Sequence, residues 1–108
     1  MSNIPAEFEQ TDKVGTTVLY SGTVNAAGGW IPAVAGKYID ELSIRCRVDQ
    51  PAATRLEYSF DNVVFHRLKV GEMREEEPRG DITQVRLRAA GSLATAIYEV
   101  AINYGRLP

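Results

Sequence analysis

The feature that most constrains the fold is the stretch from Thr54 to Val70, TRLEYSFDNVVFHRLKV. Apolar and polar residues alternate from Leu56 to Phe60, which is the period of a strand with one buried face. Asp61 and Asn62 interrupt this run, and both residue types favour tight turns. The β-prone run that begins with Val63–Phe65 follows. The stretch therefore predicts a β-hairpin that turns at Asp61-Asn62.

Similar alternation recurs along the rest of the chain. Further strands are expected within residues 15–25, 37–49, 81–90 and 93–104. Short turns with Gly, Pro or Ser separate these segments. A helix over residues 93–102 is an alternative because alanine favours helices, but the two-residue period and the Val, Ile and Tyr content argue against it. The pattern predicts an all-β fold, an antiparallel β-sandwich that is jelly-roll-like.

The length of 108 residues is that of one domain. Residues 14–108 carry the strand pattern and are expected to form a single β-sandwich domain. Residues 1–13 show no clear period and are interpreted as an N-terminal arm. Ile4 and Phe8 are apolar anchor points with which this arm would dock on its own domain or on a neighbour.

Two connecting segments have distinct compositions. The loop at residues 26–36 contains Trp30 and Ile31 between glycines and a proline. These side chains either plug one end of the core or form an exposed contact, and burial is the favoured interpretation because large apolar side chains are usually covered. Residues 71–80, GEMREEEPRG, are the most polar segment and are expected to be a solvated loop.

Charge and cysteine content narrow the possible functions. The net charge is −2, which argues against a general nucleic-acid binder. Arginine outnumbers lysine nine to three, a ratio that suits protein interfaces. A single cysteine, Cys46, excludes an intrachain disulfide, and its place in an alternating strand predicts a buried thiol. No apolar run approaches the roughly 20 residues of a membrane helix, so no membrane partner is expected.

The sequence offers few groups for catalysis. His66 is the only histidine, so a catalytic triad or a zinc site would lack partners. Phosphate-binding, dinucleotide-binding and calcium-binding loop motifs are absent from the sequence. We therefore predict no catalytic residue, no metal and no cofactor. A pair of carboxylates brought together by the fold stays open as an alternative, although no residue is singled out.

Arginines in two predicted strands form the most suggestive surface feature. Arg45 and Arg47 alternate in one strand, and Arg86 and Arg88 alternate in another. If these strands are neighbours, one sheet face carries a basic patch. The arginines would then pair with glutamates of the same sheet, or contact an acidic partner or another copy of the chain. The candidate glutamates are Glu41, Glu57 and Glu99.

The run LEYSFDNVVFHRLKVGE, followed by PRGDITQVRLRAAG and a last apolar strand, resembles small all-β structural proteins of tailed bacteriophages. These are capsid decoration or cement proteins and head or tail accessory proteins. The resemblance implies a non-enzymatic virion protein, made in the host cytoplasm, that associates with itself and stabilises the capsid by binding capsid subunits. The same hairpin phrase also occurs in carbohydrate-binding sandwiches, so a ligand-binding module is the alternative.

Under the structural interpretation, apolar loop and arm residues would be buried in a subunit interface and arginines would give polar specificity. The candidate interface residues are Ile4, Phe8, Trp30, Ile31, Arg45, Arg47, Arg86 and Arg88. Under the carbohydrate-binding alternative, Trp30 or Tyr38 would be an exposed platform for a sugar.

Overall fold

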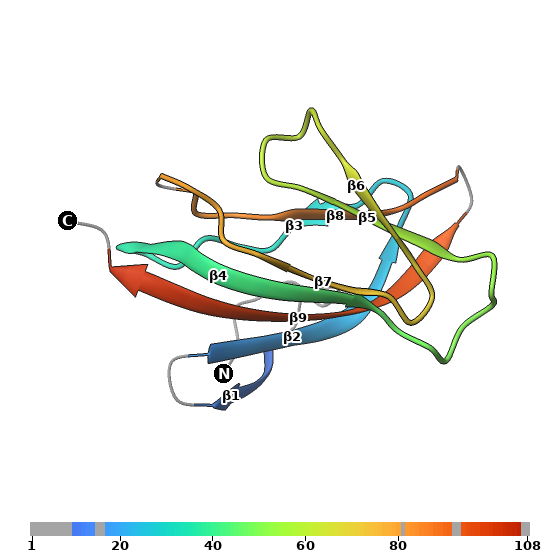
Figure 1. The fold of residues 1–108 in the computed structure, drawn as a ribbon, viewed down its shortest axis with the longest axis horizontal. Helices are drawn as coiled ribbons and strands as arrows, with labels where there is room; N and C mark the ends of the chain where they lie inside the picture. Colours follow the sequence, from blue (N-terminus) through green and yellow to red (C-terminus); the bar gives the residue numbers. More distant parts are fainter. Residues whose placement is uncertain (1–9, 15–16, 81, 92–93, 107–108) are drawn as a thin grey trace.

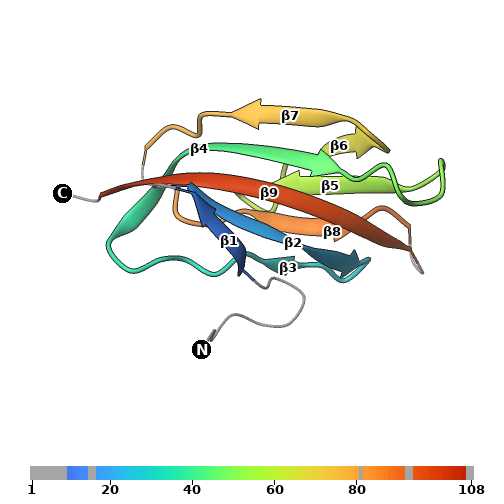
Figure 2. The same ribbon diagram turned by 90° about the horizontal axis from the view of Figure 1, so that it is seen from below.

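The computed structural model of the chain describes residues 10–14, 17–80, 82–91 and 94–106. Within these ranges the chain forms nine strands and no helix. They are β1 (Gln10–Val14), β2 (Thr17–Asn25), β3 (Gly29–Trp30), β4 (Lys37–Cys46), β5 (Arg55–Ser59), β6 (His66–Lys69), β7 (Met73–Glu76), β8 (Arg86–Ala89) and β9 (Thr95–Arg106). Figures 1 and 2 show them as two layers, with β4, β9 and β2 in one layer and β8 and β5 in the other.

The strand order identifies the topology. One sheet, sheet A, has the order β1-β2-β9-β4-β7, and the other, sheet B, has the order β3-β8-β5-β6. All pairings are antiparallel. From β2 to β9 every connection except β5–β6 crosses between the sheets, which gives the four-plus-four order of a jelly roll. The prediction of an all-β, antiparallel sandwich is confirmed.

The core lies between the inner faces of the two sheets. The alternation along β9 places Tyr98, Val100 and Ile102 inward, as predicted, and all three are buried. Sheet B supplies Leu56, Tyr58, Leu68 and Leu87 from the opposite side, and these side chains are also buried. The two-residue period of each strand therefore accounts for one shared apolar layer.

The hairpin predicted around Asp61-Asn62 is present as β5 and β6, with Tyr58 opposite His66. Its connection is longer than a two-residue turn, because residues 60–65 lie outside both strands. The carboxylate of Asp61 accepts hydrogen bonds from the backbone N–H groups of Val63 and Val64, each at 2.9 Å. These bonds occupy donors that a strand would use for its ladder, so the run that begins at Val63 is loop and not strand.

The polar segment at residues 71–80 was expected to be a loop, but it contains β7, which pairs with β4. One side chain of this edge strand is tied to the other sheet, because the Glu76 carboxylate accepts a 2.6 Å hydrogen bond from the hydroxyl of the buried Tyr58. Conversely, Val48 was expected inward but is 73% exposed, since β4 ends at Cys46. At the other end of the chain, residues 10–13, assigned from sequence to the arm, belong to β1.

Candidate functional site

The outer face of sheet A is acidic. Carboxylates project there from three neighbouring strands or from just beyond them, and Arg45 is the one described arginine among them. The acidic residues are Glu41, Glu75, Glu77 and Glu99. The Arg45 Nη1 and the Glu99 Oε1 atoms are 3.7 Å apart, and both side chains are about half exposed. Glu75 and Glu77 form no ion pair within the described parts of the chain, so this acidic face keeps an excess of negative charge.

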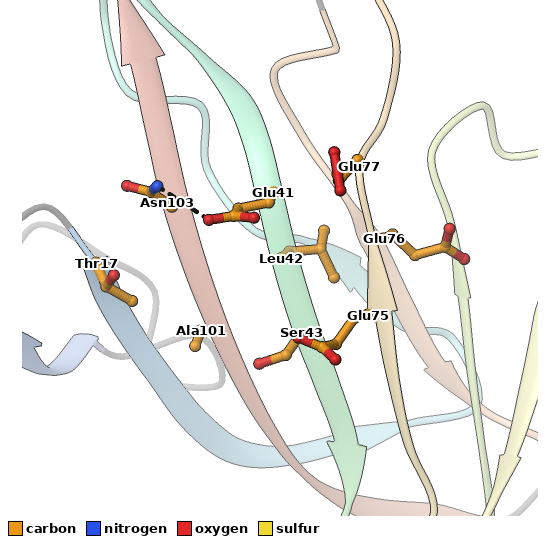
Figure 3. A pocket seen from close by; sticks show the side chains of 9 residues that line it. All are labelled: Thr17, Glu41, Leu42, Ser43, Glu75, Glu76, Glu77, Ala101 and Asn103. Carbon is orange, nitrogen blue, oxygen red and sulfur yellow. Dashed lines mark hydrogen bonds between the residues drawn. The ribbon is translucent and has the colours of Figure 1, made fainter.

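A hollow of about 410 Å³ lies on the acidic face. Figure 3 shows its wall and floor residues on β2, β9, β4 and the end of β7. The outward positions in its centre carry the small side chains Ser43 and Ala101, which leave room above the sheet. At one end the Asn103 side-chain amide donates a 3.3 Å hydrogen bond to the Glu41 carboxylate.

The hollow continues along the same face towards Leu19 and Met73. This second part has a volume of about 270 Å³ and shares Ser43 and Ala101 with the first. Its lining adds apolar groups to the acidic surroundings, and Met73 is an exposed side chain. The acidic face therefore carries a hollow that has carboxylates on its rim and apolar atoms in its floor.

The outer face of sheet B is basic. Four arginines and one lysine occupy its outward positions, with a single buried glutamate among them. The basic residues are Arg55, Arg67, Lys69, Arg86 and Arg88. Cross-strand neighbours on this face are only about 5 Å apart, so most of these cations lie close together.

Glu57 organises the centre of the basic face. It is only 7% exposed and lies between Arg67 on β6 and Arg88 on β8. Arg88 Nε donates to Oε1 at 2.7 Å, and Arg67 Nε donates to Oε2 at 2.9 Å. Burial alone would raise the pKa of Glu57, but the hydrogen bonds and charges of Arg88 and Arg67 outweigh it and lower that pKa. The guanidinium of Arg88 also lies 3.5 Å from the ring centroid of Phe65.

The β5–β6 loop carries a projection that we call the valine tip, residues 61–64. Val63 is 79% exposed and Val64 is 57% exposed. Figure 1 shows this loop standing away from both sheets on the side of sheet B. Asp61 bonds the backbone N–H groups of both valines and accepts a third hydrogen bond from the Ser59 hydroxyl. These three hydrogen bonds hold the pKa of Asp61 below its ordinary value, and the bond from the Val64 N–H has the largest effect.

The structure does not bring the four candidate arginines together. Arg45 lies on sheet A, whereas Arg86 and Arg88 lie on sheet B, so a single patch containing all of them is wrong. Arg47 follows the end of β4 and pairs with Asp49 at 3.0 Å. Sequence reasoning could not place the strands because the jelly roll sends β4 and β8, which both alternate, to different sheets. Pairing with glutamates of the same sheet is confirmed for Arg45 and Arg88.

The apolar candidates also differ in position. Ile31 is 1% exposed and belongs to the core of its own domain, so its assignment to an interface is wrong. Trp30 is half-buried on β3, opposite Arg86 and therefore on the side of the basic face. Ile4 and Phe8 lie outside the described residues. Trp30 is thus the apolar candidate that the structure places near a charged face.

Sequence reasoning missed the valine tip and the hollow. The tip carried a signal in the sequence Asp61-Asn62-Val63-Val64, since an Asp can accept hydrogen bonds from backbone N–H groups two and three residues later and so form a turn. The hollow carried no such signal, because it depends on which small residues become neighbours across β2, β9 and β4.

Cys46 is buried as predicted, and burial raises the pKa of its thiol. The described residues contain no group of three or more His, Cys, Asp or Glu side chains suited to a metal ion.

Comparison with known proteins gives a likeness of fold. A scan against models of protein families found no match, and neither did a search of curated protein sequences. Among solved structures the chain is similar to protein NMB1881 from Neisseria meningitidis, with a TM-score of 0.52 and 11% sequence identity over 91% of this chain and 84% of that one. No helix in the described part of this chain is long and apolar enough to cross a membrane. The likeness supports the all-β sandwich fold.

Proposed function

We propose that this chain is a non-enzymatic structural protein that associates with itself and with other protein subunits through the outer faces of its sheets. In this proposal it is a component of a phage particle, where it stabilises the capsid by binding capsid subunits. The observation that carries the proposal is the opposite charge of the two faces. Complementary potentials favour specific association and set the register between partners.

The form of the two faces supports a contact with a protein surface. The hollow spans several strands and is bordered by carboxylates, whereas the basic face is a broad array of guanidinium groups around Glu57. Arginine is enriched at protein interfaces, and the valine tip adds an exposed apolar group of the kind that fills the centre of an interface. The virion part of the proposal follows from the resemblance of the central hairpin and the β8 region to phage structural proteins.

The test is the solution mass of the full chain, measured by light scattering coupled to size exclusion over a series of protein concentrations. We expect a mass above that of the 11.9 kDa monomer that increases with concentration and decreases at high salt. A monomer at every concentration, with no binding to purified capsids of a phage that encodes this chain, would contradict the proposal.

A second candidate is a carbohydrate-binding module, favoured by the lining of the hollow. Thr17, Ser43, Asn103 and Glu41 present hydroxyl, amide and carboxylate groups, which are partners for sugar hydroxyls, in a volume typical of small-ligand sites. A glycan array with the wild type and with Ser43→Phe, which fills the hollow, tests it. Binding that the substitution abolishes would favour this candidate over the structural one.

A further inference from the structure

We propose that the partner of the acidic face is the basic face of a second copy of this chain, with the valine tip of one copy seated in the hollow of the next. This inference rests on the proposed function and deepens it by naming the partner and the contact. It is argued from the charge, the shape and the relative position of the two faces.

Charge is the first argument. Four carboxylates and one arginine occupy the acidic face, and five basic side chains with one glutamate occupy the basic face. The surplus charges are exposed, since Glu75, Glu77, Arg67 and Lys69 are all open to solvent. A face in contact with its own kind would set like charges together, whereas contact between unlike faces pairs them.

Shape is the second argument. The valine tip projects on the side of sheet B, and its three hydrogen bonds to Asp61 hold it in one conformation. Asn62 adopts a left-handed backbone conformation with φ of 61° at the apex, which further defines the turn. A projection that is ordered before binding loses little conformational entropy when it is buried.

The hollow suits this projection. Its second part, with Leu19, Met73 and Ala101 in the lining, presents apolar atoms to an apolar guest. Glu99 and its partner Arg45 border this part, and Glu41, Glu75 and Glu77 border the adjoining first part. Two valine side chains that are now exposed would lose contact with water there. Arg88, whose guanidinium lies over the ring of Phe65 next to the tip, would be brought near Glu99 and the carboxylates of the first part of the hollow. A single orientation of the two copies therefore brings their apolar groups together and also brings their opposite charges together.

Position is the third argument. The acidic face and the basic face are the outer surfaces of opposite layers of the sandwich, so one copy presents them in opposite directions (Figures 1 and 2). Two different surfaces that bind each other form a heterologous interface, which continues from copy to copy as a ring or an open stack. The contact thus predicts head-to-tail assembly rather than a two-fold dimer.

The test uses two variants of the full chain, each with one blocked face. Val63→Asp with Val64→Asp places carboxylates on the valine tip, and Glu75→Lys with Glu77→Lys reverses two charges on the acidic face. All four side chains are exposed, so neither variant is expected to disturb the core. Each variant alone should raise the dissociation constant for self-association about thirtyfold or more. Val48→Asp, a substitution of an equally exposed valine outside both faces, is the matched control and should associate as the wild type does.

Mixing the two variants is the decisive step. The tip variant keeps its acidic face and the acidic-face variant keeps its tip, so an equimolar mixture should form a dimer of one chain of each kind and grow no further. Sedimentation velocity measures this directly. A mixture that stays monomeric, or variants that assemble as the wild type does, would overturn the proposed contact. If the wild type oligomerises under those outcomes, the proposed function stands and only this interface fails. A wild type that is monomeric removes this interface, and one that also fails to bind the capsids removes the proposed function as well.

Discussion

Glu57 provides the sharpest test of the electrostatics of the basic face. Its side chain is nearly covered, and Arg67 and Arg88 hold one carboxylate oxygen each. We consider Arg67→Met and Arg88→Met, singly and together. Methionine keeps an unbranched apolar stem of similar reach, so the substitution removes the charge and the hydrogen bonds more than the packing.

The expected losses differ between the two arginines. Arg67 is the more exposed, so Arg67→Met should cost about 1 kcal/mol of unfolding free energy or less. Arg88 gives the shorter hydrogen bond and also covers the Phe65 ring, so Arg88→Met should cost about 2–3 kcal/mol. The double variant leaves a covered carboxylate without a cation and should lose about 3–5 kcal/mol at neutral pH.

The measurement is urea denaturation followed by far-ultraviolet circular dichroism, at neutral pH and at mildly acidic pH. In the wild type the lowered pKa of Glu57 contributes stability above the unfolded-state pKa, and this contribution is lost as pH falls through the folded-state pKa. Without Arg67 and Arg88, burial dominates and raises that pKa. The folded state then binds the proton more tightly, so the double variant should gain stability as pH falls.

A further substitution separates charge burial from packing. Adding Glu57→Met to the double variant should recover most of the lost stability, because no unpaired charge remains under the surface. The reasoning is refuted if the double variant unfolds at the wild-type urea midpoint, or if its stability falls with acidification as steeply as that of the wild type.

Three other perturbations test separate parts of the structure. Asp61→Ala removes the acceptor of two backbone amides in the valine tip, so those amides should exchange hydrogen faster by NMR while the core amides stay protected. Gly28→Ala should lower the melting temperature by more than Gly36→Ala does. Both glycines have a positive φ, in which an alanine costs about 1–2 kcal/mol of stability. Of these two positions, only Gly28 would place the new Cβ against the Leu87 carbonyl oxygen. Cys46 is buried and its thiol pKa is raised, so a thiol reagent should label the native protein no faster than the chain unfolds.

The strand pattern shows which features neighbouring residues alone can predict. Alternation from Leu42 to Cys46 and from Tyr98 to Ile102 was sufficient to predict strands and their buried faces, because each side chain's burial follows from a two-residue period. A hairpin around Asp61-Asn62 was also predicted, although its connection covers residues 60–65 and includes the valines that the sequence placed in the second strand. The charged strand β7 was not predicted, because its pairing with β4 and the bond from Tyr58 to Glu76 come from distant parts of the chain.

The candidate surfaces divide in the same way. Local sequence placed Arg86 and Arg88 outward on one strand and Arg45 outward on another, and that was correct for each strand taken alone. Only the jelly-roll crossovers decided that these strands belong to opposite sheets, which turned one expected basic patch into a basic face and an acidic face. The physical reason is that side-chain direction is a property of neighbouring residues, whereas the partners of a strand depend on contacts between segments far apart in sequence.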